Sequence, residues 1–283
     1  MVVLKSRRRL PTQLAGCIAI LLIVAMGLAL AGCGSKQTAT KGPDPNKDPK
    51  AAYLKACEDA KTVTPAKVET DLKAVIAGEP GVTWQGTPGS SRVKVVTWTK
   101  KDYYDKYAGQ DYKLPADANV WVSLYPEVKN FANKDRVSNE PLRIEQLLGL
   151  PPGNNATKFV EFWVNPADMF RPSPDPEITD HEANVDFPTI NNRFLSFNDS
   201  SYVVEWDGAA NADKSYTYQQ WFDNRKSTVY SGAYPYPWTR LGYTYDWGTN
   251  AKNHEGPSEF VILGGSTINV SSVTPTAEYL KSD

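Results

Sequence analysis

Several common catalytic motifs are missing from this sequence. It has no Gly-x-Ser-x-Gly nucleophile motif, no glycine-rich loop that would cradle phosphate, and no cysteine set beside a histidine. With two histidines in 283 residues, it also lacks the His-Glu-x-x-His pattern of many zinc enzymes. The sequence therefore gives no support to those hydrolase and nucleotide-binding classes, and we expect no resident cofactor.

One long apolar stretch stands near the N-terminus. Lys5 and Arg7–Arg9 precede it, and residues 14–31 carry no charge. A positive head, an apolar middle and small residues at the exit are typical of a secretory signal. The closing residues, Leu30-Ala31-Gly32-Cys33, resemble the lipobox of bacterial lipoproteins. The resemblance implies that residues 1–32 are a signal peptide, and that Cys33 carries acyl chains such as palmitate.

The alternative for this stretch is an uncleaved membrane helix, because its length falls in the spanning range of about 17 to 25 residues. Both interpretations place the body outside the cytoplasm, since the arginines stay inside. Gly34, rather than Asp, follows Cys33. By resemblance this favours the outer membrane in a Gram-negative source. The sequence thus predicts a cell-envelope protein that is attached to a membrane through the acyl chains.

Removal of the signal peptide leaves a mildly acidic chain with few thiols. Residues 1–32 hold four basic residues and no acidic one, so 27 basic and 32 acidic residues remain. This balance argues against binding of nucleic acid. Cys57 is then the one thiol without lipid, so no internal disulfide can form, and we expect Cys57 to be buried.

The remaining chain predicts a tether followed by one domain. Residues 33–47 are rich in Gly, Ser, Lys, Thr and Pro, which indicates a flexible tether. Residues 48–283 are expected to form a single globular domain. Two proline-initiated segments with helical apolar spacing predict a helical hairpin over residues 48–78.

Strand patterns follow this hairpin without regular strand–helix alternation. We therefore expect an α+β fold with a mostly antiparallel sheet and with long proline- and aromatic-rich loops. Residues 260–263 and 267–273, around Gly264-Gly265, predict a last hairpin. The other clearest predicted strands are residues 93–97, 120–124 and 158–164.

A proline-rich acidic loop gives the first candidate site. Its carboxylates, with one imidazole, could hold a hard cation through oxygen or place a base near a metal-bound water. The alternative is an acidic surface loop whose carboxylates cap turns. The possible metal ligands are Asp175, Glu177, Asp180 and His181.

An aromatic loop over residues 231–248 gives the second candidate site. Exposed Trp and Tyr rings stack on sugars, and Arg binds acidic groups, so this loop would suit a cell-wall glycan or an envelope protein. The alternative is core filling, although Tyr236 and Trp238 are flanked by prolines and are expected to be exposed. The possible ligand-binding residues are Tyr236, Trp238, Arg240 and Trp247.

The functional expectation is a lipid-anchored envelope protein that acts as a binding or structural factor without catalysis. The alternative is a metal-dependent hydrolase acting in the envelope. Residues 142–152, 171–178 and 237–247 are similar to stretches in uncharacterised secreted proteins of Gram-negative bacteria. That resemblance implies no activity or site.

Overall fold

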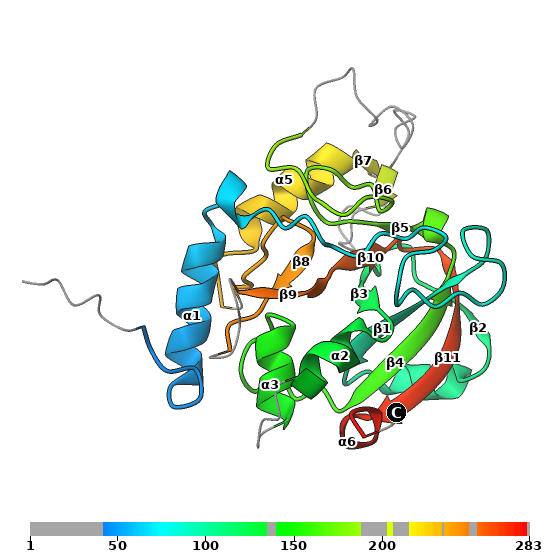
Figure 1. The fold of residues 1–283 in the computed structure, drawn as a ribbon, viewed down its shortest axis with the longest axis horizontal. Coiled ribbons are helices and arrows are strands. Elements are labelled where there is room, and N and C mark those ends of the chain that lie inside the picture. The colour runs from blue at the N-terminus through cyan, green and yellow to red at the C-terminus, as the bar shows by residue number, and fades with distance from the viewer. Residues whose placement is uncertain are drawn as a thin grey trace, which may run out of the picture. The chain divides into compact units, whose positions relative to one another are not determined.

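The computed structural model describes residues 42–134, 140–187, 203–205, 215–233, 235–248 and 254–281 (Figure 1). The predicted signal peptide and Cys33 lie outside these residues. The compact unit that contains all of the described residues begins at Gly42. Among them, no helix combines the length and the apolar character needed to cross a bilayer.

A seven-stranded sheet forms the centre of this unit, with the strand order β2-β11-β4-β1-β3-β10-β5. Each neighbouring pair is antiparallel. Together with the helices, the sheet confirms the predicted α+β class, and the strands expected near residues 93–97, 120–124 and 158–164 all form. The strands are β1 (Val93–Thr99), β2 (Asp111–Lys113), β3 (Val120–Leu124), β4 (Lys158–Val164), β5 (Met169–Phe170), β10 (Phe260–Ile262) and β11 (Thr267–Pro275).

The predicted last hairpin is wrong, because β10 and β11 do not pair with each other. β10 pairs with β3 and β5, whereas β11 pairs with β4 and β2. The turn between them is held by other contacts: Gly264 N donates to Asn119 Oδ1 at 2.9 Å. A Cβ at Gly264 would collide with the carbonyl oxygen of Ala116. This glycine therefore allows a close crossing over the 115–119 segment rather than a two-strand turn.

The predicted N-terminal helical hairpin is wrong in its second half. Helix α1 (Pro49–Ala60) begins as expected, since the Asp48 side chain accepts a hydrogen bond from Ala51 N at 3.0 Å. Its buried stripe includes Cys57, as predicted. After the short 3-10 helix η1 (Pro65–Lys67), however, the chain is not helical.

Residues 68–78 lack a helix because their backbone bonds elsewhere. Leu72 N donates to His181 O at 3.0 Å, and Val75 N donates to Ile178 O at 2.7 Å. The segment that was predicted to be a helix therefore lies along the acidic loop, and its apolar side chains enter the core from an extended backbone.

The end of the predicted tether packs against the compact unit. Pro45 is buried, and Gln146 Nε2 donates to Asn46 Oδ1 at 3.2 Å. Gln146 belongs to helix α3 (Glu140–Leu147). These contacts place the first packed residues before the predicted boundary at residue 48.

The two faces of the sheet pack against different apolar clusters. One face holds a single apolar cluster around Val95, Val122 and Phe162. On the other face the cover is divided. One cluster lies under α2, α3 and α6, and another lies under α5. The helices are α2 (Glu127–Lys134), α5 (Tyr218–Thr228), α6 (Thr276–Tyr279), η2 (Asp102–Tyr107) and η3 (Pro166–Asp168).

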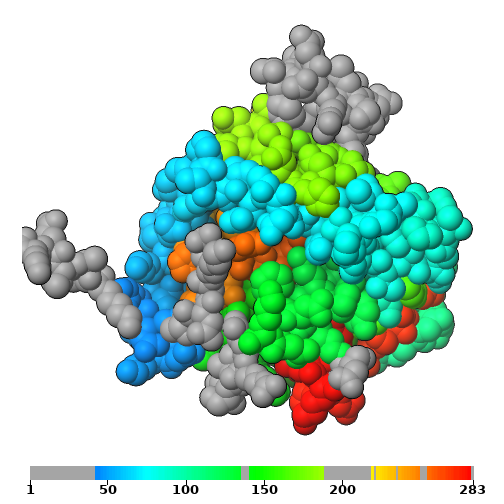
Figure 2. All heavy atoms as spheres, in the orientation of Figure 1, coloured from blue at the N-terminus to red at the C-terminus, as the bar shows by residue number. Residues whose placement is uncertain are grey.

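Two short sheets complete the unit: β6 (Val203–Glu205) with β7 (Ser215–Thr217), and β8 (Tyr243–Tyr245) with β9 (Glu255–Ser258). In Figure 2 the cyan segment after α1, the orange region of β8 and β9, and green α2 meet on one surface. Ser258 joins all three, because Lys73 N donates to its Oγ at 2.9 Å and Ser258 N donates to Glu127 Oε1 at 3.1 Å.

Candidate functional site

The acidic loop surrounds a buried arginine. Arg171 is 0% exposed, and its guanidinium donates to the carbonyl oxygens of Glu177 at 3.2 Å and Asp180 at 2.9 Å. Burial lowers the pKa of Arg171, while the carboxylates of Asp180, Glu177 and Asp175 counteract that shift. The acidic residues of this loop therefore compensate a desolvated positive charge.

The four predicted metal ligands do not converge. Asp175 Oδ2 accepts from Asn184 Nδ2 at 2.8 Å, and Glu177 Oε2 accepts from Thr179 N at 3.0 Å. His181 Nδ1 lies 2.8 Å from the carbonyl oxygen of Leu72, which it satisfies as a donor. Burial and the neighbouring Glu177 raise the pKa of Asp180 to about 6.

Within the described residues, a different trio, Glu69, Asp71 and Glu255, brings three possible ligand atoms within 4.8 Å of one another. No three of the predicted ligands meet that separation. The hydrogen bond from Thr179 N to Glu177 agrees with the alternative interpretation, in which the carboxylates cap turns, whereas the buried Arg171 was not predicted.

Most of the predicted aromatic surface is core. Trp238 is 1% exposed, and its Nε1 donates to Pro172 O at 3.1 Å. Trp247 is 3% exposed and meets the Tyr53 ring edge-on at 5.8 Å. Arg240 is 7% exposed and donates to Lys61 O at 2.7 Å. The expectation of an exposed Trp238 is therefore wrong, and these three residues form no open binding surface.

Tyr236, the fourth of these residues, is half-buried and lines a cavity of about 240 Å³. The cavity opens where β1 and β3 separate. Their antiparallel ladder ends at Val96↔Ser123. Beyond that point β1 continues to pair with β4 and β3 continues to pair with β10. We call this space between β1 and β3 the cleft.

Two tryptophans explain why the strands separate. The register of the ladder would place Trp98 opposite Trp121. Trp98 packs with the cluster under α3, and its Nε1 donates to Thr276 Oγ1 at 2.8 Å. Trp121 packs instead against Trp221 and Trp238. Trp98 packs in the apolar cluster under α2, α3 and α6, and Trp121 packs in the cluster under α5. Because the two rings pack in different clusters, β1 and β3 separate between them.

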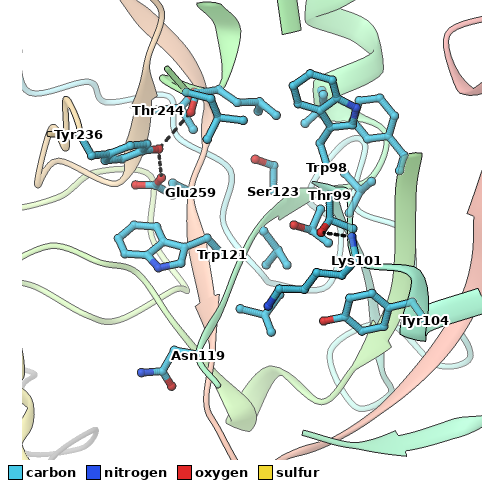
Figure 3. Close-up of a pocket in the computed structure, with 18 residues that line it drawn as sticks. Trp98, Thr99, Lys101, Tyr104, Asn119, Trp121, Ser123, Tyr236, Thr244 and Glu259 are labelled. Atoms are coloured by element: carbon cyan, nitrogen blue, oxygen red, sulfur yellow. Dashed lines mark hydrogen bonds between the residues drawn. The ribbon is translucent and has the colours of Figure 1, made fainter. Parts of the chain in front are cut away.

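Aromatic and aliphatic side chains form most of the cleft wall, with polar groups at its two ends (Figure 3). The rings of Trp98 and Phe159 stack at 6.1 Å on one side, and those of Trp121 and Tyr236 lie 6.3 Å apart on the other. The lining also includes Val96, Thr97, Thr99, Lys101, Tyr104, Asn119, Val120, Val122, Ser123, Val128, Leu148, Leu150, Thr244 and Glu259.

Glu259 is a buried carboxyl in this lining, 3% exposed. The Tyr236 hydroxyl lies 3.0 Å from Leu148 O and 3.3 Å from Glu259 Oε1, so it shares its proton between two acceptors. Burial raises the pKa of Glu259 to about 8, against the opposing effects of Tyr236 and Arg225. Burial therefore favours the protonated form of Glu259.

The second oxygen of Glu259 is not bonded to Tyr236. Within the part of the chain that the structure describes, Oε2 has no hydrogen-bond partner and is not among the fully enclosed unpartnered atoms. Glu259 is thus a lining residue with one carboxyl oxygen that no described group satisfies.

Lys101 stands at the other end of the cleft. Its backbone N donates to Thr99 Oγ1 at 3.1 Å, which fixes the turn after β1. Its side chain is exposed, and Figure 3 shows it extending toward the β3 side. Nζ lies 5.8 Å from the Tyr103 ring and forms no ion pair with the described residues. The cleft therefore has an ammonium at its mouth.

Sequence reasoning found one residue of this site, Tyr236. Glu259 and Trp121 were not predicted, because the apolar–polar alternation around them is that of an ordinary strand. The separation of two neighbouring strands leaves no pattern in the local sequence. Such an arrangement is suited to holding an organic molecule between rings. No family model, curated protein or solved structure matches the chain.

Proposed function

We propose that this protein is a lipid-anchored binding protein of the cell envelope, and that its ligand site is the cleft. The anchor is supported by the basic head, the apolar residues 14–31 and the lipobox-like ending at Cys33. The binding role is supported by a cavity of about 240 Å³ whose walls are mostly aromatic and aliphatic. Pockets for small ligands commonly combine apolar walls with a few polar groups that fix orientation.

Glu259 is the observation that carries the binding role. A buried polar atom without a partner costs about 1 to 3 kcal/mol. Oε2 of Glu259, a residue of the cleft lining, has no hydrogen-bond partner among the described residues. A ligand group that hydrogen-bonds to this carboxyl would recover part of such a cost, so the carboxyl is better suited to binding than to packing.

A cavity-filling variant tests the proposal. Ser123 lines the cleft from β3, so Ser123→Phe should place a ring in the space that a ligand would occupy. Ser90 is exposed and outside the cleft, which makes Ser90→Phe the matched control. A panel of aromatic fragments is followed by saturation-transfer NMR. We expect hits on the wild type and on Ser90→Phe, and their loss on Ser123→Phe.

Folding is checked for each variant by near-UV circular dichroism and by thermal melting. Fragment binding that survives unchanged in a folded Ser123→Phe protein would overturn the assignment of the cleft. A wild type that binds no member of the panel would do the same.

A further inference from the structure

The separation of β1 from β3 leaves part of each strand without a neighbour on one side. The ladder between the two strands closes with Val96 opposite Ser123. Beyond that pair, residues 97–99 of β1 still pair with β4, and residues 120–122 of β3 still pair with β10. All of these residues line the cleft. The cleft is therefore bounded by two strand edges as well as by side chains.

The register of the strands determines which backbone groups point into this space. On the edge of β1 that faces β3, Lys94 O accepts a hydrogen bond from Tyr125 N at 3.1 Å. Successive residues of a strand direct their N–H and C=O groups alternately to its two sides. Trp98, four residues after Lys94, therefore directs both groups towards β3. By the same count Trp121, four residues before Tyr125, directs both groups towards β1.

These two N–H and two C=O groups have no partner in the fold. Among the described residues, no hydrogen bond involves the backbone of Trp98 or Trp121. The register would pair the two residues with each other if the ladder continued. Unpaired strand edges are templates for the backbone of another chain. Because two such edges face the same space, one extended segment can pair with both.

The number of free groups matches three residues of an extended chain. A strand between β1 and β3 runs antiparallel to one and parallel to the other, because β1 and β3 are antiparallel. In the antiparallel pair, its middle residue exchanges both bonds with one tryptophan. In the parallel pair, the C=O of its first residue and the N–H of its third residue bond to the other tryptophan. The closed pair of Val96 and Ser123 leaves no gap for a longer strand.

The two tryptophans also determine which side chain suits the middle residue. Residues opposite one another in a sheet direct their side chains to the same face. The middle side chain would therefore lie beside the rings of Trp98 and Trp121, which Figure 3 shows on either side of Ser123. Phe159 and Tyr236 add rings next to them, which favours an aromatic side chain. The first and third side chains would point to the other face, which a single apolar cluster fills, so they must be small.

We propose that the cleft binds a short extended segment of another polypeptide as an added strand between β1 and β3, with an aromatic side chain in the middle of the segment and small side chains on both sides. This inference rests on the proposed binding role of the cleft and specifies its ligand class as a peptide that is recognised through its backbone. An aromatic molecule without amide groups would fill the space between the rings and leave the four backbone groups unpaired.

Blocked tripeptides test the backbone contacts by NMR titration of the isotope-labelled full chain in detergent. The reference is acetyl-alanyl-phenylalanyl-alanine amide, and each of three analogues replaces the N–H of one residue by an ester oxygen. In either direction of the segment, the N–H groups of the second and third residues are used and that of the first is not. An ester at the second or third residue should weaken binding about tenfold, because a C=O of the protein loses its donor. An ester at the first residue is the matched control and should not change the affinity.

The amides of the protein give a second readout without any substitution. In the free chain, the backbone N–H groups of Trp98 and Trp121 should exchange with solvent faster than those of Val96 and Ser123, which are paired. Saturation with the reference tripeptide should slow exchange at Trp98 and Trp121 by about tenfold or more. Exchange at both tryptophans that does not change on saturation would contradict an added strand.

Two further comparisons place the tripeptide in the cleft. Acetyl-trialanine amide lacks the middle ring and should bind about tenfold more weakly than the reference. Ser123→Phe, which fills the space between the rings, should abolish binding of the reference, and Ser90→Phe should leave it unchanged. Binding that survives in a folded Ser123→Phe protein would overturn the placement.

The peptide class is overturned if the reference tripeptide does not bind, or if the esters at the second and third residues bind as tightly as the reference. The fragment panel decides separately whether the cleft is a binding site, because its aromatic compounds need no amide group. Fragments that bind while the tripeptide does not would keep the proposed function and refute this ligand class.

Discussion

The buried acid Glu259 should make this protein less stable as the pH rises, and the substitution Glu259→Gln should remove that dependence. Its pKa is about 8 in the folded chain and 4.5 ordinarily. Between those values the unfolded chain has lost the proton and the folded chain has kept it. Rising pH therefore favours unfolding by about 1.4 kcal/mol per pH unit. Across the whole window, the loss attributable to Glu259 is about 5 kcal/mol.

Glu259→Gln cannot ionise, so it removes this dependence. The free energy of unfolding of each protein is measured by urea titration at pH 5, 6, 7 and 8. The stability of the variant relative to the wild type should rise steadily across this series, by about 4 kcal/mol in total. Any constant effect of the amide on packing shifts all four points equally and leaves the slope unchanged.

Glu127 provides an internal comparison, because it is half-buried with an enclosed Oε2, and desolvation raises its pKa to about 7. Its contribution is present in both proteins and cancels in their difference. The same series on Glu127→Gln should rise by about 3 kcal/mol in all and level off near pH 7, one unit earlier. A difference between Glu259→Gln and wild type that does not change from pH 5 to pH 8 would refute the neutral buried acid.

Two other substitutions test the anchor and the acidic loop. Cys33→Ser should abolish incorporation of labelled palmitate. Cys17→Ser, in a second Leu-Ala-Gly-Cys stretch, should leave the incorporation unchanged. A wild-type protein that takes up no label would contradict the lipid anchor. Arg171→Met should cost about 3 to 5 kcal/mol of unfolding free energy, because it leaves the surrounding buried polar groups unpaired. Arg92→Met removes an exposed ion pair with Asp111 and should cost about 1 kcal/mol or less; equal costs in urea titrations would refute the central role of Arg171.

Local patterns predicted the strands and part of the helices, because alternation and capping act over a few residues. β4 was recognisable from its apolar run, and α1 from Asp48 followed by Pro49. Strand order was not predictable in this way. The two glycines at 264–265 indicated a hairpin, whereas β10 and β11 pair with strands from distant parts of the chain.

The burial of several candidate site residues was not predictable for a related reason. The carboxylates near residue 177 were predicted as possible metal ligands, but the tertiary fold buries Arg171 among them. Trp238 appeared exposed because prolines flank it, but Phe222 and Trp221 pack against its ring. Burial of long side chains depends on partners far along the chain, so it could not be inferred from neighbouring residues.

The short stretch between Cys33 and the compact unit limits the distance between the proposed anchor and the domain. Gly42 opens the compact unit, and eight residues, or nine Cα-to-Cα steps, separate it from the proposed acylated Cys33. A fully extended chain gains at most about 3.6 Å per residue, so the linker spans no more than about 30 Å. That length is comparable to the width of a small domain. With Cys33 acylated, the proposed binding cleft would stay close to the bilayer that holds the anchor. Such a protein would bind molecules near that membrane rather than carry them between membranes.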